Sequence, residues 1–298
     1  MVQELQIGGT RPANGQYADR KPERRMQTIA IRPSLTMAYE DHWFGDPWTT
    51  PETVVMVHGN AESSRAWAGW VPRLAAKYRV VRPDMPGFGA SSEPVGYRWT
   101  AAELAADLRR FLDKLGIAQC HLVGAKYGGS VCMQFASEST ERLHSLALFG
   151  SPVRGSGTGA ADAIRARGVR QWAAETQRAR LGSTASPEQV RWWTDELMGK
   201  SNTHAVLSAS SSRIDMELEE RLSNITVPTL IVTTHESGLQ SVEAVRRYAA
   251  RFPDARVIVL DGDSYHIAAV APDVCAGHAL RFFESVAGRP AAMPGAAE

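Results

Sequence analysis

Apolar and polar residues follow two different periods along most of this chain. Short apolar runs of the kind found in buried strands are separated by longer segments whose apolar residues recur every three or four positions, as on one face of a helix. This alternation predicts an α/β fold, with a mostly parallel twisted sheet and helices on both of its faces. The expected strands are Gln27 to Arg32, Leu35 to Trp43, Thr53 to His58, Arg79 to Pro83, Cys120 to Val123, Leu143 to Phe149, Thr229 to Thr234 and Arg256 to Leu260.

Helices are expected between these strands, and the clearest one runs from Ala101 to Leu115. Thr100 can cap its start, and its apolar residues form one stripe. The stripe consists of Leu104, Leu108, Phe111, Leu112 and Leu115. Further helices are expected from Ser63 or Ser64 to about Tyr78, from Tyr127 to Ser139, near Ser241 to Phe252 and near Pro272 to Ser285.

The alternation of strands and helices stops between residues 152 and 225. The pattern there is mainly helical, rich in Ala and Arg, and interrupted by Gly-Ser segments. It predicts a helical cap inserted over the C-terminal edge of the sheet, where ligands of open α/β sheets bind. The predicted core is therefore residues 26–151 and 226–287, preceded by a flexible polar arm (1–25) and followed by a disordered tail (288–298).

Composition and charge narrow the class of protein. A hydrophobic content of 44% and a net charge of +1 are typical of a soluble globular protein, and they favour neither nucleic acid nor a membrane as a partner. The three cysteines lack metal-ligand spacing, so we expect no metal, no cofactor and no disulfide framework. Without a secretory signal or a spanning segment, a cytoplasmic location is expected. The expected partner is a small-molecule substrate; the oligomeric state stays open, with a homodimer as one option.

The segment Gly124-Ala125-Lys126-Tyr127-Gly128-Gly129 lies where a strand is expected to turn sharply into a helix. A G-x-S-x-G segment in such a place is typical of the nucleophile elbow of serine hydrolases. In this chain the surrounding residues fit that pattern, and Lys126 occupies the position of the serine. The segment therefore predicts a fold more directly than it predicts a chemistry.

Four segments in this order resemble the α/β-hydrolase superfamily over about residues 27–284. They are His58-Gly59-Asn60-Ala61, Asp84 to Ser91, the turn at Lys126, and Gly262-Asp263-Ser264-Tyr265-His266 followed by Pro272. The short cap and the run from Val227 to Pro272 look like the small-molecule members, such as enol-lactonases, carbon–carbon bond hydrolases, perhydrolases and dehalogenases. Dehalogenases need an aspartate at the elbow, which this chain lacks.

The resemblance implies a set of site residues. Lys126 takes the elbow position, His266 is the expected general base and acid, and Glu236 is the candidate carboxylate of the triad. The backbone N–H groups of Asn60 and Tyr127 are the expected oxyanion hole. The candidates for substrate binding are Trp67, Trp172 and Trp192, and no metal site is expected.

A lysine at this position changes the chemistry that is possible. The N-terminus of the following helix and burial under a cap both disfavour an ammonium group, so a partly neutral and nucleophilic Lys126 is expected. Acyl transfer to an amine gives an amide, which resists the hydrolysis that completes a serine hydrolase cycle. We therefore expect action on a small carbonyl compound, by hydrolysis or carbon–carbon bond cleavage.

Several routes stay open. Lys126 can form an imine with a ketone or aldehyde, as in a Schiff-base lyase or decarboxylase. It can instead stay charged and bind a carboxylate or enolate oxygen while His266 activates water. The site can also be inactive and only bind a ligand, or the chain can be a serine hydrolase in which the serine was engineered to lysine. Arginines of the cap are candidates for binding a substrate carboxylate: Arg165, Arg167, Arg170 and Arg213.

Overall fold

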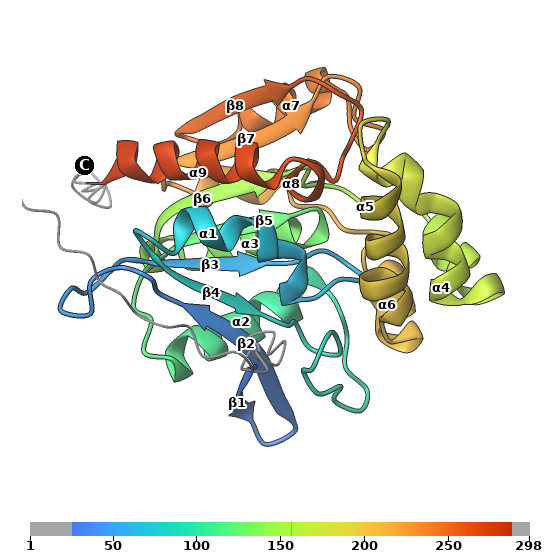
Figure 1. The fold of residues 1–298 in the computed structure, drawn as a ribbon, viewed down its shortest axis with the longest axis horizontal. Helices are drawn as coiled ribbons and strands as arrows, with labels where there is room; N and C mark the ends of the chain where they lie inside the picture. The colour runs from blue at the N-terminus through green and yellow to red at the C-terminus, as the bar shows by residue number, and fades with distance from the viewer. Residues whose placement is uncertain (1–25, 156, 288–298) are drawn as a thin grey trace, which may run out of the picture.

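The chain folds around an eight-stranded sheet in a computed structural model, which describes residues 26–155 and 157–287 (Figure 1). The strands are β1 (Gln27–Arg32), β2 (Leu35–His42), β3 (Thr53–Val57), β4 (Arg79–Pro83), β5 (Cys120–Ala125), β6 (Leu143–Phe149), β7 (Thr229–Thr234) and β8 (Ala255–Leu260). Their order across the sheet is β1-β2-β4-β3-β5-β6-β7-β8. β2 pairs antiparallel with β1 and β4, and all other neighbours are parallel. The predicted α/β fold with a mostly parallel sheet is confirmed.

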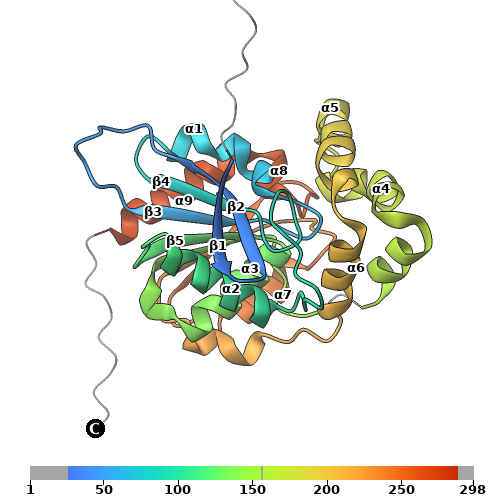
Figure 2. The same ribbon diagram turned by 90° about the horizontal axis from the view of Figure 1, so that it is seen from below.

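Helices cover both faces of this sheet, which lies between two helix layers in Figure 2. The predicted stripe of the first long helix packs against the sheet, because Leu104, Leu108 and Phe111 are all buried. Burial of each such side chain stabilises the fold by about 1.5–3 kcal/mol. The layers consist of α2 (Ala101–Lys114), α3 (Tyr127–Glu138) and α7 (Val242–Ala249) on one face, and α1 (Val71–Leu74) and α9 (Pro272–Val286) on the other.

The helix expected from about residue 64 to Tyr78 is two shorter helices in the structure. A 3-10 helix, η1 (Ser64–Trp70), is followed directly by α1. Pro72 lies in the first turn of α1 and has no N–H to donate to the preceding turn, so a new helix begins there. The apolar face is retained nevertheless, because Trp67 and Trp70 are both buried.

Between β6 and β7 the chain leaves the sheet and forms a segment that we call the helical insert (residues 152–225, of which 156 is not described). Figures 1 and 2 both place it beside the carboxyl ends of the parallel strands, the edge at which open α/β sheets bind ligands. Its longest helix is broken at Gly168, whose φ of 77° lies in a region that glycine adopts without strain. Its helices are α4 (Gly159–Leu181), α5 (Pro187–Arg191) and α6 (Thr203–Ser212), with the short helices η3 (Trp192–Leu197), η4 (Met198–Lys200) and η5 (Glu219–Asn224).

Three other expectations concern the chain as a whole. The predicted arm and tail, residues 1–25 and 288–298, lie outside the described residues. None of the helices in the described part of the chain has the length and apolar character needed to cross a bilayer. Cys120, Cys132 and Cys275 are buried and unpaired, and burial raises the pKa of Cys120 and of Cys275 to about 12, which keeps these thiols protonated.

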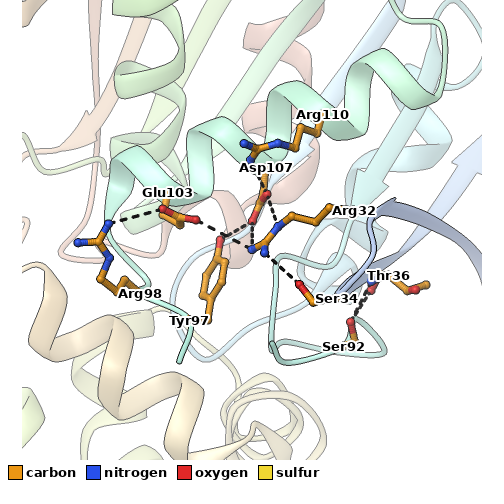
Figure 3. A network of polar contacts seen from close by, with 9 residues as sticks. All are labelled: Arg32, Ser34, Thr36, Ser92, Tyr97, Arg98, Glu103, Asp107 and Arg110. Atoms are coloured by element: carbon orange, nitrogen blue, oxygen red, sulfur yellow. Dashed lines mark hydrogen bonds and ion pairs between the residues drawn. The ribbon is translucent and has the colours of Figure 1, made fainter. Parts of the chain in front are cut away.

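A buried carboxylate joins the first strand to α2 (Figure 3). Asp107, whose residue is 0% exposed, accepts hydrogen bonds from Arg32 at 3.1 and 3.2 Å and from Arg110 at 2.8 Å. The hydroxyl of Tyr97 donates a further hydrogen bond at 2.9 Å. Because a buried charge is stable only when it is paired, this network fixes β1 against the helix layer.

Candidate active site

Lys126 lies in a strained turn between β5 and α3. Its φ of 52° and ψ of −125° place a residue with a β-carbon in a region that such residues rarely adopt, at a cost of about 1–3 kcal/mol. The turn is close to the neighbouring strand, since a β-carbon at Gly128 would lie 2.3 Å from the carbonyl oxygens of Val57 and His58. The predicted strand–turn–helix arrangement is therefore present, and it directs the side chain of Lys126 away from the sheet.

The structure brings Lys126 and His266 together, as the sequence predicts. The amino group of Lys126 lies 2.5 Å from Nε2 and 3.3 Å from Nδ1 of the imidazole. On its other side it contacts the carboxylate of Glu62, a residue that the sequence analysis missed. The side chains of Lys126 and Glu62 are 12% and 2% exposed, so water screens their interaction only weakly.

Glu62 reaches this position because the chain folds back after β3. Ala61 has a φ of 61°, a left-handed conformation, and Oε2 of Glu62 accepts a hydrogen bond of 2.9 Å from the N–H of Gly59. A β-carbon at Gly59 would lie 2.8 Å from Cε of Lys126, so glycine leaves room for the lysine stem. The available signal in the sequence was a single carboxylate within the predicted oxyanion loop.

His266 lies in the loop between β8 and α8 (Ile267–Val270). Its backbone N–H donates to Oγ of Ser264 at 3.1 Å and to the carbonyl oxygen of Arg180 at 3.3 Å. No carboxylate of the described residues contacts either ring nitrogen. Glu236, the candidate acid of the triad, is exposed, and its side chain makes no hydrogen bond or ion pair within the described residues. The structure therefore does not bring Glu236 to the site.

Burial controls the charges of this cluster. It lowers the pKa of Lys126 well below its usual value, and the positive charges of Arg180 and Arg213 act in the same direction. The Glu62 carboxylate opposes them, because an adjacent negative charge favours the ammonium form. Burial, Lys126 and Arg180 lower the pKa of His266 well below its usual value, so its imidazole is neutral at pH 7. Burial and the two arginines therefore favour release of the Lys126 proton, whereas Glu62 favours its retention.

The backbone N–H groups of Asn60 and Tyr127 have no acceptor among the described residues, which leaves both available for the oxygen of a bound carbonyl compound. The side chain of Asn60 is used differently. It donates to the carbonyl oxygen of Val206 at 3.2 Å and to Oγ of Ser210 at 2.8 Å, both in α6. The expected oxyanion loop is thereby fixed to the helical insert.

Two spaces adjoin Lys126. The larger is a cavity of about 230 Å³ between the sheet edge and the helical insert. The smaller, about 10 Å³, has room for about one water molecule. Lys126 lines both spaces, whereas His266 lines only the smaller one. The described residues around the larger cavity are Asn60, Lys126, Tyr127, Pro152, Arg154, Ala160, Trp172, Arg180, Arg213, Met216, Leu239 and Tyr265.

The three tryptophans expected to bind substrate differ in position. Trp172 lines the larger cavity, and Trp67 lines the smaller space. Trp192 lines neither space and lies under the guanidinium of Arg65, 5.1 Å from it. Its neighbour Trp193 is at the site instead, with its ring centroid 5.9 Å from the amino group of Lys126. Helical periodicity did not distinguish two adjacent tryptophans, because a local π-helix changes which of them faces inward.

Known proteins share the fold that positions this site. The model of the alpha/beta hydrolase fold matches residues 52–270. The chain is 30% identical over 232 residues to the pimeloyl-(acyl-carrier protein) methyl ester esterase of Aeromonas hydrophila, covering 71% of this chain and 87% of that esterase. It is 37% identical over 101 residues to the 2-hydroxy-6-oxo-2,4-heptadienoate hydrolase of Pseudomonas putida, covering 33% of this chain and 37% of that hydrolase.

Solved structures show the same architecture. The enol-lactonase of Burkholderia xenovorans LB400 matches with a TM-score of 0.77 over 86% of this chain and 99% of the lactonase. The sequence identity in that comparison is 19%, so this likeness concerns the fold. From the matched family model and the esterase that aligns over most of both chains, the chain belongs to the α/β hydrolase family.

Proposed function

We propose that this protein is an enzyme that breaks a carbon–carbon bond next to the carbonyl group of a small molecule, with the amino group of Lys126 as the nucleophile. The observation that carries this proposal is the position of Lys126 between the larger cavity and His266. A ligand in the cavity meets the amine first, whereas the imidazole lies behind it. In this proposal Lys126 is therefore the residue that touches the substrate, and His266 affects the reaction only through its contact with Lys126.

In the proposed reaction, the neutral amine adds to the carbonyl carbon and forms a carbinolamine. The former carbonyl oxygen leaves as water, which gives an imine on Nζ. The electron pair of the bond between the α- and β-carbons moves into this protonated imine as that bond breaks. The departing fragment leaves as CO₂ from a β-carboxylate, or as a carbonyl compound once its β-hydroxyl group has given its proton to a base such as the Glu62 carboxylate. The resulting enamine takes up a proton on carbon, and water then hydrolyses the imine and restores the amine.

The neighbours of Lys126 are suited to the proton transfers that this reaction requires. The Glu62 carboxylate contacts the amino group and can accept its proton, and the neutral imidazole of His266 lies 2.5 Å from the amino group on the other side. The same groups can return a proton to the oxygen that leaves as water. The N–H groups of Asn60 and Tyr127 support the proposal further, because they can hold the carbonyl oxygen during attack.

The relatives also support carbonyl chemistry. One is named for a methyl ester and the other for a 6-oxo compound, so both names describe carbonyl compounds. A cytoplasmic location for this chain remains a prediction.

Hydrolysis by water is the second candidate, and the smaller space favours it. A single water molecule beside His266 can be deprotonated there and attack a carbonyl group, while a charged Lys126 stabilises the oxyanion. In this alternative Lys126 assists and forms no covalent bond. A ligand-binding protein without turnover is the remaining rival.

A turnover screen separates these functions. The purified protein is incubated with an ester, a lactone, a β-hydroxy ketone and a 3-oxo acid, and products are identified by mass spectrometry. The proposal predicts cleavage of the β-hydroxy ketone or the 3-oxo acid, its loss in Lys126→Met, and full activity in Lys77→Met, which changes an exposed lysine. Ester or lactone hydrolysis that survives Lys126→Met contradicts the proposal, and so does saturable binding without any product.

A further inference from the structure

The larger cavity carries positive charge that nothing in the described protein neutralises. Arg180 in α4 and Arg213 directly after α6 both line it, together with Lys126. None of the described lining residues is an aspartate or a glutamate. Among the described residues, Glu62 pairs with Lys126 from the smaller space, and no ion pair is formed by Arg180 or Arg213.

The two arginines are held by groups that leave their charge uncompensated. The guanidinium of Arg180 lies 4.0 Å from the ring centroid of Trp172 and donates to Oγ1 of Thr176 at 3.0 Å. The guanidinium of Arg213 lies 5.6 Å from the ring centroid of Tyr127, and its buried Nε has no hydrogen-bond acceptor among the described residues. Within those residues, neither arginine forms an ion pair.

Other arginines of the helical insert show the contrast. Arg154, at the same cavity, is paired with Glu219 at 2.8 Å. Arg165 pairs with Asp162 at 2.8 Å and Arg167 pairs with Glu175 at 2.7 Å, both on the surface. Of the arginines expected as carboxylate ligands, only Arg213 faces the cavity, and Arg180 was missed.

Burial is costly for these two cations. It lowers the pKa of Arg180 and of Arg213 from the usual arginine value, and the charge of Arg180 lowers the pKa of Arg213 further. Arginine nevertheless stays protonated in proteins, so the cavity contains two half-buried guanidinium groups that repel each other. An arrangement that destabilises the free protein is expected where a ligand of opposite charge compensates it.

We propose that Arg180 and Arg213 bind an anionic group of the substrate, so that the carbonyl compound acted on by Lys126 also carries a carboxylate or a phosphate. The fork of each guanidinium matches the paired oxygens of either group. Tyr265 lines the same cavity, close enough to both arginines for their charges to act on its pKa. The carbonyl part of this inference rests on the function proposed for Lys126; the anion site does not.

Calorimetry with matched ligands tests the anion site. The probes are 4-oxopentanoate, its methyl ester, pentanoate and glycerol 3-phosphate, each titrated into the full chain. The inference predicts that 4-oxopentanoate binds at least about 10-fold more tightly than its ester, and that Arg213→Met or Arg180→Met weakens its binding about 10- to 100-fold. Arg170→Met, which changes an exposed arginine of α4, leaves binding unchanged.

Pentanoate separates this inference from the proposed function. It has no carbonyl group that can form an imine, so its arginine-dependent binding in Lys126→Met supports the anion site even if Lys126 is not a nucleophile. Tighter binding of glycerol 3-phosphate than of pentanoate assigns the site to a phosphate. Equal affinity for 4-oxopentanoate and its ester, with no binding of the phosphate, overturns the inference.

The stability of the ligand-free variants gives an independent readout. Because both cations are half-buried and form no ion pair within the described residues, Arg213→Met is expected to melt at the same temperature as the unmodified protein or above it. A purely structural role for Arg213 predicts a lower melting temperature. A lower melting temperature together with unchanged pentanoate affinity contradicts the anion site.

Discussion

The contact between Glu62 and Lys126 has a measurable energetic signature. Their side chains are 2% and 12% exposed, so an effective dielectric constant of about 20 is appropriate, and unit charges about 3 Å apart then attract by about 5–6 kcal/mol. Removal of one partner of a buried ion pair typically costs about 3–5 kcal/mol. We therefore expect Glu62→Gln and Lys126→Met each to lower the free energy of unfolding by about that amount at pH 7.

The double variant distinguishes this pair from two independent sites. With both charges removed, neither side chain leaves an unpaired ion, so Glu62→Gln/Lys126→Met should be close to the unmodified protein in stability. Urea unfolding, monitored by tryptophan fluorescence, measures the free energy of unfolding of the unmodified protein, the two single variants and the double variant. If the double variant loses as much stability as the two single variants together, to within about 0.5 kcal/mol, the result contradicts the ion pair.

The pH dependence of Glu62→Gln provides a second check. Without the carboxylate, the pKa of Lys126 in the folded protein lies below its value in the unfolded chain, about 10.4. A lysine whose pKa is lower in the folded protein destabilises the fold at every pH below its pKa in the unfolded chain. This penalty disappears as the pH rises and the amine becomes neutral in both states. The stability deficit of Glu62→Gln should therefore shrink as the pH rises from 7 toward 10. A deficit that grows over this range contradicts the account.

Three further predictions concern other parts of the molecule. Lys126→Ser should not produce an efficient serine hydrolase, because no carboxylate in the described part of the chain orients His266, and a complete triad exceeds such a site by about 10⁴-fold. Rapid turnover of p-nitrophenyl acetate by this variant would instead favour a serine hydrolase parent. Asp107→Ala should lower the free energy of unfolding by about 3–5 kcal/mol, since it leaves Arg32 and Arg110 without their shared partner. The control Glu103→Ala, at a half-buried position, should change the free energy of unfolding by less than about 1 kcal/mol. Equal losses in urea unfolding would contradict this ranking. Cyanate should carbamylate Lys126 at a lower pH than Lys77, because burial lowers the pKa of Lys126, and peptide mass spectrometry that finds the same pH profile for both lysines would contradict a depressed value.

Much of the fold could be predicted because its signals are local. Runs such as Thr53 to Val57 are apolar throughout, as strands buried on both faces must be, and the stripe of α2 repeats with the helical period. The turn at Lys126 has glycines where the backbone approaches its neighbours closely. These features need no knowledge of distant residues.

The site was predicted less completely because its members meet through irregular backbone. Glu62 reaches Lys126 only because Ala61 adopts a left-handed conformation, which no apolar period encodes. Arg180 differs from the exposed arginines of α4 by facing the cavity, a difference set by how the helical insert packs on the sheet. Glu236 follows the expected strand, but its loop directs it to solvent.

Trapping of the imine tests the central role of Lys126 most directly. The protein is mixed with 4-oxopentanoate, reduced with sodium borohydride and digested, and the peptides that contain Lys126 and Lys77 are compared by mass spectrometry. The account predicts a reduced secondary-amine adduct on Lys126, at a level far above that on Lys77, and its absence in Lys126→Met. An unmodified Lys126 in a sample that still cleaves its carbonyl substrate would contradict it.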